Sequence, residues 1–113
     1  MDHSFEITET TDAGLPVVAV AGEIDVATAP GLRERLQALV AAGNATIVVN
    51  LLEVSFLDST ALGVLVGVLK RCREAGGDLR LVVSEPRILK VFEITGLTDV
   101  FAIYADVAGA TTA

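Results

Sequence analysis

Three consecutive polar residues, Asp58-Ser59-Thr60, are the side chains of this sequence best placed to take part in chemistry. They follow an apolar stretch that ends at Leu57, and an apolar run with helical spacing follows them. Side-chain oxygens of Asp, Ser and Thr accept hydrogen bonds from the free N–H groups of a first helical turn. Asp58 or Ser59 is therefore the predicted N-cap of a helix that continues to about Ala75. A hydroxyl there lies at the surface beside the positive end of a helix dipole, where phosphate is well tolerated.

A plain helix cap is the simplest alternative interpretation of these hydroxyls. Asp58 alone can cap the helix, however, so the hydroxyls of Ser59 and Thr60 are redundant for that purpose. A second polar break, Gly22-Glu23-Ile24-Asp25, follows another apolar stretch that reads as a strand. Because strand ends in an open α/β sheet gather on one edge, where sites form, the sequence predicts that both breaks lie at that edge.

Other kinds of site have little support in the sequence. The single histidine, His3, lies near the start of the chain, and we expect it to be a tail residue and not a metal ligand. The single cysteine, Cys72, is expected to pack within a helix, because no neighbouring histidine could activate it as a nucleophile. Gly76-Gly77 follows a predicted helix and is expected to end it. We therefore predict no catalytic residue, no metal and no cofactor.

The composition limits the class of partner. The chain has 113 residues, of which 52% are hydrophobic, and this suits a single domain with its own core. The net charge of −7 argues against nucleic acid and against an anionic membrane surface as partners. One cysteine rules out an internal disulfide, and we find no signal-peptide pattern and no apolar stretch long enough for a membrane span. The expected location is the cytoplasm.

The elements that must position Ser59 follow from the spacing of the apolar residues. Alternation predicts strands over residues 4–10 and 15–22, joined by turn residues between them. A strand is also predicted to end at residue 51, with Asn50 just before its end. The later predicted elements are, in order, a helix capped by Thr28 or Ala29 and ending at Gly43-Asn44, the strand over residues 45–51, the helix from Asp58 to Ala75, a strand over residues 79–83, a helix from Pro86 to Gly96, and a strand over residues 100–104.

This order of elements predicts an α/β fold. Right-handed crossovers after the first hairpin give a mixed, mostly parallel sheet with an antiparallel edge hairpin at the N-terminal end and helices packed against it. Residues 1–113 are expected to form one domain, with residues 4–105 as its core. Asp106 could cap a final helix, but residues 107–113 are few and rich in Gly and Thr. They are expected to be a short terminal helix or a frayed tail, with the last few residues fraying.

Two segments resemble the signatures of a known family. Residues 54–63 (VSFLDSTALG) are similar to the signature of the anti-anti-sigma factors, also called anti-sigma factor antagonists, which are small bacterial STAS-domain proteins. Gly22-Glu23-Ile24-Asp25 resembles the second motif of that family, Gly-Glu-Leu/Ile-Asp. The resemblance covers almost the whole chain, from the first hairpin to the strand that ends at Tyr104, and it implies a STAS-type fold.

The resemblance also implies a function without enzymatic activity. In that family the Ser after the Asp is phosphorylated by an anti-sigma factor that is also a serine protein kinase, and this position is Ser59 here. The unmodified protein binds the anti-sigma factor and frees a sigma factor, phosphorylation switches it off, and a serine phosphatase resets it. A monomer or weak dimer is expected. The residues implied in partner binding are Glu23, Asp25, Asp58, Ser59, Thr60 and Leu62.

The sequence departs from the family pattern near the motif. The family commonly has Asp-Ser-Ser-Gly-Leu-Gly, and Thr60 and Ala61 stand at its middle positions here. Thr60 keeps a hydroxyl and is a secondary candidate for phosphorylation, whereas Ala61 should stiffen the first helical turn. Asn50 stands where the family strand usually ends in Asp. Three alternatives stay open: a scaffold-type STAS domain acting by assembly, a small-ligand or nucleotide-sensing STAS module, and a regulatory domain of an anion transporter.

Overall fold

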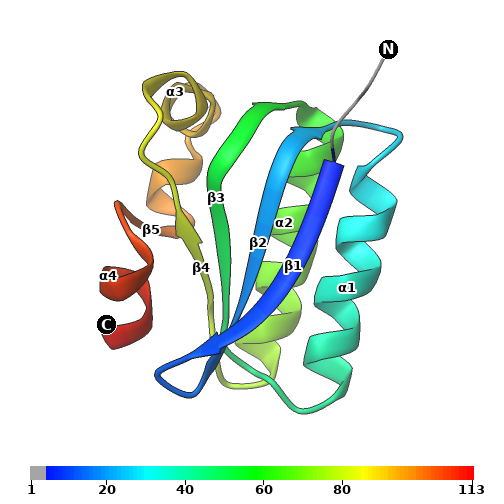
Figure 1. Cartoon of the computed structure of the whole chain (residues 1–113), viewed down its shortest axis with the longest axis vertical. Helices are drawn as coiled ribbons and strands as arrows, with labels where there is room; N and C mark the ends of the chain where they lie inside the picture. Colours follow the sequence, from blue (N-terminus) through cyan, green and yellow to red (C-terminus); the bar gives the residue numbers. More distant parts are fainter. Residues whose placement is uncertain (1–4) are drawn as a thin grey trace.

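The N-terminal hairpin forms one side of a five-stranded sheet in the computed structural model, which describes residues 5–113 (Figure 1). β1 and β2 pair antiparallel, β3, β4 and β5 follow in parallel, and the order is β1-β2-β3-β4-β5. This confirms the predicted mixed α/β fold; His3 and Ser4 lie outside the described residues. The strands are β1 (Phe5–Asp12), β2 (Leu15–Ile24), β3 (Ile47–Leu57), β4 (Leu79–Val82) and β5 (Ala102–Tyr104). The helices are α1 (Ala29–Ala41), α2 (Ser59–Glu74), α3 (Pro86–Ile94), the short 3-10 helix η1 (Leu97–Asp99) and α4 (Val107–Thr112).

The helices divide unequally between the two faces of the sheet. Figure 1 shows α1 and α2 behind the sheet, α4 beside β4 and β5, and no helix in front of β1 and β2. The main core contains Leu32 and Leu36 of α1 and Leu65 and Leu69 of α2, all at most 2% exposed. A smaller cluster on the α4 side consists of Val17, Val48, Val82 and Ala110.

β3 is longer than predicted because it contains two irregularities. Its register against β2 gains one extra residue after Asn50 and another after Val54. Leu51, Val54 and Leu57 therefore stay on the buried face at a spacing of three, which a regular strand with a period of two does not allow. The predicted strand end at residue 51 is wrong. Asn50 lies within the strand, where its Oδ1 accepts a hydrogen bond from the Leu52 N–H at 3.0 Å.

β2 also continues further than the sequence pattern indicated. Gly22, Glu23 and Ile24 belong to the strand, and Glu23 and Ile24 pair with Phe56 and Leu57 of β3. The strand end predicted at Gly22 is therefore two residues too early, because pairing with the extended β3 holds Glu23 and Ile24 in the sheet. The chain leaves the sheet at Asp25.

The C-terminal segment is a short helix, one of the two forms expected for it. Asp106 caps α4, with its Oδ1 accepting from the Gly109 N–H at 2.7 Å. Arg80 Nη1 in β4 donates to the Ala110 carbonyl at 2.8 Å, and the Ala110 side chain is fully buried. A cap, a side-chain hydrogen bond to a late carbonyl and apolar burial stabilise a helix that is too short to persist alone.

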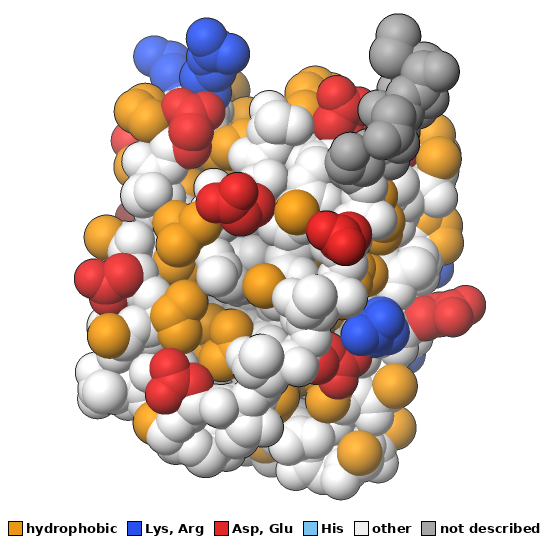
Figure 2. All heavy atoms as spheres, viewed as in Figure 1, with side chains coloured by type: hydrophobic (Ala, Val, Ile, Leu, Met, Phe, Trp, Pro, Cys, Tyr) orange, Lys and Arg blue, Asp and Glu red, His pale blue; other side chains and the backbone are white. Residues whose placement is uncertain are grey.

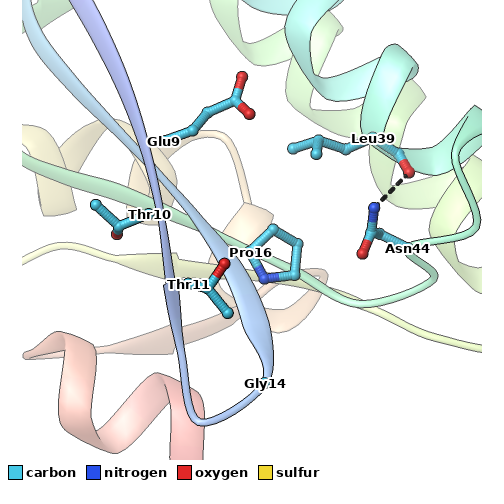
Figure 3. A pocket seen from close by; sticks show the side chains of 7 residues that line it. All are labelled: Glu9, Thr10, Thr11, Gly14, Pro16, Leu39 and Asn44. Carbon is cyan, nitrogen blue, oxygen red and sulfur yellow. Dashed lines mark hydrogen bonds between the residues drawn. The ribbon is translucent and has the colours of Figure 1, made fainter.

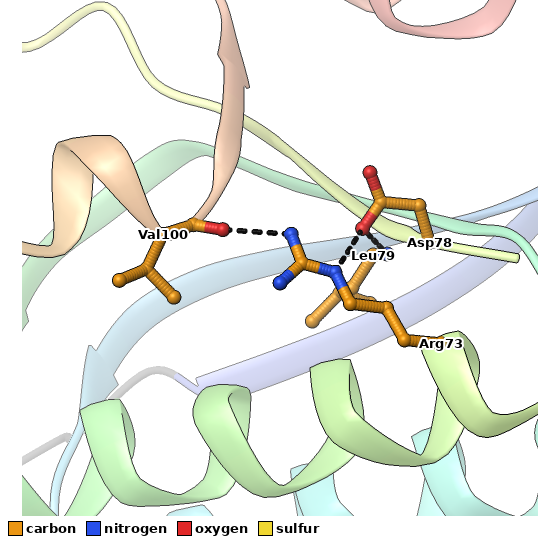
Figure 4. Close-up of polar contacts among 4 residues, drawn as sticks. All are labelled: Arg73, Asp78, Leu79 and Val100. Carbon is orange, nitrogen blue, oxygen red and sulfur yellow. Dashed lines mark hydrogen bonds and ion pairs between the residues drawn. The ribbon is translucent and has the colours of Figure 1, made fainter.

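The end of the sheet at which β3 and β4 begin is joined tightly to α2. Gly77 lies against the chain before β3, because a Cβ added there would stand 2.1 Å from the Ala45 carbonyl oxygen. Arg73 of α2 donates through Nε to Asp78 Oδ1 at 3.3 Å and through Nη2 to the Val100 carbonyl at 2.8 Å (Figure 4). α2 ends at Glu74 and Gly76 has a φ of +90°, so the predicted glycine stop is confirmed.

Candidate functional site

Asp58 provides the N-cap of α2. Its backbone is extended, and its Oδ1 accepts a hydrogen bond from the Ala61 N–H at 3.0 Å. Its carbonyl oxygen accepts from the Leu62 N–H at 3.1 Å. These two bonds satisfy the third and fourth N–H groups of the helix, and the carboxylate lies beside the positive end of the helix dipole. The prediction of a cap at this position is confirmed, with Asp58 and not Ser59 in that role.

Ser59 is the first helical residue, and it is exposed. Within residues 5–113 its hydroxyl neither donates nor accepts a hydrogen bond, and the same holds for the hydroxyl of the half-buried Thr60. The first two N–H groups of α2, those of Ser59 and Thr60, have no acceptor in this part of the chain either. The helix thus begins with a solvent-accessible hydroxyl beside two free donors.

The second motif forms a loop organised by Asp25. Its Oδ1 accepts from the Ala27 N–H at 3.0 Å, from the Thr28 N–H at 3.1 Å and from the Thr28 hydroxyl at 3.2 Å. The Thr28 Oγ1 accepts from the Asp25 N–H at 2.9 Å, and its single hydroxyl hydrogen is shared between Asp25 Oδ1 and the Glu23 carbonyl, which lies 2.9 Å away. Thr28 is the N-cap residue of α1 by position, but its side chain makes no cap bond to the helix because these loop contacts use it.

The two motif loops lie next to each other, as the sequence predicted. Ile24 and Leu57 are paired across β2 and β3, and the Asp58 N–H donates to the Ile24 carbonyl at 3.2 Å. We call this end of the sheet the carboxyl edge, meaning residues 25–28, 58–60 and 83–85, which follow β2, β3 and β4. The opposite end is the amino edge, meaning residues 13–14, 42–46 and 75–78.

The remaining residues expected to bind a partner occupy different environments. Glu23 is exposed and lies opposite Phe56 in the sheet. Leu62 lies within the main core and is 8% exposed, so little of its side chain is accessible from outside. The expectation that Leu62 contacts a partner stays a prediction.

Exposed apolar side chains near the motif loops were missed by the sequence reasoning. Phe56, in β3, is 49% exposed, and Val26, directly after Asp25, is 72% exposed. Regular alternation would have placed Phe56 on the same face as the buried Val54. The irregularity between them reverses that, and the uneven apolar spacing of residues 51–57 is the one signal in the sequence that could have indicated it.

A surface pocket of about 340 Å³ lies far from Ser59, at the amino edge (Figure 3). It is bounded by the hairpin and the C-terminal end of α1, and Asn44 there donates through Nδ2 to the Leu39 carbonyl at 3.0 Å. Its charged lining residue is Glu9, whose carboxylate accepts a hydrogen bond from the Arg35 Nε at 2.5 Å. Its lining residues are Glu9, Thr10, Thr11, Gly14, Pro16, Leu39 and Asn44.

The rest of the described chain offers little other reactive chemistry. Cys72 is fully buried in α2, as predicted, and burial, followed by the nearby Asp78 carboxylate, raises the pKa of its thiol. A protonated, enclosed thiol is a poor nucleophile. Residues 5–113 hold no cluster of three or more side chains able to bind a metal ion, and none of their helices is long and apolar enough to cross a bilayer.

Comparison of the sequence with known proteins shows which family the chain is similar to. The family model of the STAS domain matches residues 4–110. The chain is 46% identical over 92 residues to an anti-sigma-B factor antagonist of Bacillus subtilis, covering 81% of this chain and 84% of the relative.

Solved structures show the same fold. An anti-sigma factor antagonist from Mycobacterium paratuberculosis superposes with a TM-score of 0.89 at 30% identity, covering 99% of this chain and 95% of that one. The Bacillus cell fate determinant SpoIIAA in its phosphorylated form superposes with a TM-score of 0.71 at 22% identity, covering 94% and 96%.

Proposed function

Because this chain belongs to the STAS-domain family of anti-sigma factor antagonists, whose members are regulators and not enzymes, we propose that it binds an anti-sigma factor through its carboxyl edge. Binding makes the anti-sigma factor release its sigma factor. Phosphorylation of Ser59 ends the binding, and so the hydroxyl works as a switch.

The observation that carries this proposal is that two neighbouring residues, Asp58 and Ser59, have different roles. Asp58 alone caps α2 through the Ala61 N–H. Ser59 is exposed, and its hydroxyl has no hydrogen-bond partner in the part of the chain that the structure describes. A structural hydroxyl would be bonded, whereas a hydroxyl that serves as a substrate must be reachable from outside.

A phosphate on Ser59 should change the partner and leave the fold alone. It adds about −1.5 to −2 charges, and the unpaired N–H groups of Ser59 and Thr60 at the helix N-terminus can stabilise them. In a partner interface the same dianion would lose its water next to the Asp58 carboxylate. A coupling of about 1–3 kcal/mol, or about 5–150-fold in affinity, is enough for regulation.

The proposed partner contacts surround this hydroxyl. They come from Glu23 and Asp25 on the second motif and from Asp58, Ser59 and Thr60 on the first. Leu62 acts beneath them as a core residue. Thr60 is a secondary phosphorylation candidate, since its hydroxyl also lacks a partner among residues 5–113, but its half-buried position makes it the poorer substrate.

The proposed partner is an anti-sigma factor that is also a serine kinase. It transfers the γ-phosphoryl group of ATP to the Ser59 Oγ, the hydroxyl proton leaves and ADP is released. A serine phosphatase restores the free hydroxyl. The phosphorylated SpoIIAA structure supports the view that a domain of this fold carries the modification. We further propose that the protein works in the cytoplasm as a monomer or weak dimer.

Phosphorylation itself is tested by incubating the protein with its cognate anti-sigma factor and ATP, followed by mass spectrometry. One phosphate is expected on Ser59, and Ser59→Ala should remove the labelling. Thr60→Ala should retain most of it. A phosphate found on other residues while Ser59 stays unmodified would refute the proposal.

The effect on binding is tested by calorimetry with the same partner. Ser59→Asp should weaken the affinity at least about fivefold, and Ser59→Ala should bind as the wild type does. Ser84→Asp is the matched control, because Ser84 is an exposed serine that also lies on the carboxyl edge. Equal losses for Ser59→Asp and Ser84→Asp would mean that general charge, and not a switch at one position, governs binding.

A further inference from the structure

Three large apolar side chains are prominently exposed among residues 5–113, and two of them flank the motif loops. Phe56 lies two residues before Asp58 and is 49% exposed, and Val26 follows Asp25 and is 72% exposed. The third, Ile94, is 74% exposed at the end of α3. Single exposed apolar residues are common on protein surfaces, so position and local geometry must decide which of them have a function.

The exposure of Phe56 results from an irregularity in the strand. β2 and β3 pair Gly22 with Val54 but Glu23 with Phe56, so one extra β3 residue intervenes. Val54 and Leu57 consequently face the core, and Phe56 faces outward opposite Glu23. Irregularities of this kind re-aim side chains and are frequent beside functional sites.

The geometry points to Phe56 and Val26 as the apolar anchors of the anti-sigma factor interface, an inference that rests on the function proposed above. Each anchor adjoins one motif: the Phe56 strand leads into Asp58-Ser59, and Val26 lies in the loop closed by Asp25. The Asp58 N–H to Ile24 carbonyl hydrogen bond holds the two motifs together. Phe56 and Val26 are therefore carried on one rigid unit with Ser59.

The charge around these two residues indicates what the partner must look like. Glu23 and Glu53 are exposed on the strands next to Phe56, and residues 1–32 contain no Lys or Arg. Figure 2 shows acidic side chains spread over the uncovered face and few Lys or Arg on it, and five of the eight basic residues lie on α1 and α2. The occupant is the anti-sigma factor, presenting an apolar recess for Phe56 that is bordered by basic side chains.

These anchors also explain why one phosphate would be enough to end binding. An aromatic side chain in a recess excludes water from its surroundings, and charges cost most where water is excluded. Removing the Phe56 ring would let water back to the neighbourhood of Ser59. The penalty of a negative charge at Ser59 should then decrease, so the two positions are expected to be coupled.

The first test measures the affinity of unphosphorylated variants for the anti-sigma factor. Phe56→Ser should weaken binding about tenfold or more, and Val26→Ser by a smaller factor of about three. Ile94→Ser is the control, because Ile94 is at least as exposed as Phe56 and Val26 but lies on α3, and it should change affinity less than twofold. Melting temperatures must stay close to that of the wild type. Unchanged affinity in Phe56→Ser, or equal losses in Ile94→Ser, would overturn the inference.

The second test combines Phe56→Ser with Ser59→Asp in a double-mutant cycle. The affinity loss caused by Ser59→Asp should be at least threefold smaller in the Phe56→Ser background than in the wild type. Strictly multiplicative losses would overturn the inferred coupling and leave the switch at Ser59 intact. The reverse result, a Phe56 effect with no Ser59→Asp effect, would refute the proposed switch and keep the anchor.

Discussion

The two edges of the sheet join strands to helices by different means. At the carboxyl edge, carboxylate side chains close the loops: Asp58 caps α2, and Asp25 accepts three hydrogen bonds within four residues. At the amino edge, the backbone itself is tightly packed, with Gly77 against the Ala45 carbonyl, and the hairpin turns on Ala13 and Gly14, both with positive φ. Side-chain bonds such as Arg73 to Asp78 exist at the amino edge too, so its distinguishing feature is this close approach of the main chain.

Because of this difference, the carboxyl edge can serve function, whereas the amino edge serves stability. Side-chain bonds at the carboxyl edge leave the Ser59 hydroxyl outside the network, so its chemistry can change without breaking a structural contact. Gly77 at the amino edge has no such tolerance, because a single carbon added there must displace the backbone. Substitutions at the two edges should therefore affect different measurements.

The largest expected effect is at the amino edge. Gly77→Ala places a Cβ 2.1 Å from the Ala45 oxygen, and the backbone must shift to accommodate it. We expect a loss of about 3 kcal/mol in the free energy of unfolding, measured by urea denaturation. The folded fraction of the Gly77→Ala protein should still be phosphorylated as the wild type is.

The control for this prediction is Gly63→Ala, in the exposed face of α2, where an added Cβ meets nothing within 4 Å. Alanine should stabilise the helix there by up to about 1 kcal/mol. If Gly63→Ala and Gly77→Ala have the same effect, close backbone approach does not distinguish the amino edge.

The next effect in size concerns the loop that Asp25 closes. Asp25→Ala removes the acceptor for the Ala27 and Thr28 N–H groups and for the Thr28 hydroxyl, and should cost about 1–2 kcal/mol of unfolding free energy. Asp25→Asn retains an acceptor oxygen and should recover most of this loss. Equal losses in both variants would show that charge, and not loop geometry, matters at Asp25.

A smaller loss is expected at the cap of α2. Asp58→Ala leaves the Ala61 N–H without its acceptor and should lower the unfolding free energy by about 1 kcal/mol. Asp58→Ser, which keeps a capping oxygen, should be nearly neutral in the same denaturation experiment. If Asp58→Ala leaves the unfolding free energy unchanged, another group must cap the helix in its place.

The smallest effect on stability is expected at Ser59 itself. Ser59→Asp places a second carboxylate beside Asp58, but the helix N-terminus compensates for the added charge, so the unfolding free energy should change by less than about 0.5 kcal/mol. Amide exchange of α2 should be unaltered. A large destabilisation would erase the distinction between the two edges.

Much of the fold could be predicted because the helices carry their own start and stop signals. Asp58, Pro86 and Asp106 mark helix beginnings, and Gly76 and Gly96 mark endings with positive φ. The adjacency of the two motifs also followed from the strand order. These features are local, so the sequence contains them directly.

The features that escaped prediction depend on tertiary pairing. The two extra residues in β3 turn Leu51, Val54 and Leu57 all toward the core and reverse the side on which Phe56 lies. Which of the two expected forms the C-terminal residues take, helix or frayed tail, likewise depends on the distant Arg80 side chain. The hydrophobic period of a single strand does not reveal these features, because they depend on contacts with other elements of the fold.

The single cysteine of the chain has a consequence for the signals that this protein can receive. Cys72 is enclosed in α2, and burial raises the pKa of its thiol, so peroxides and disulfides meet no accessible thiolate. The folded protein is therefore insensitive to direct oxidation at sulfur through this residue. Redox stress would have to reach it through the activity of another protein.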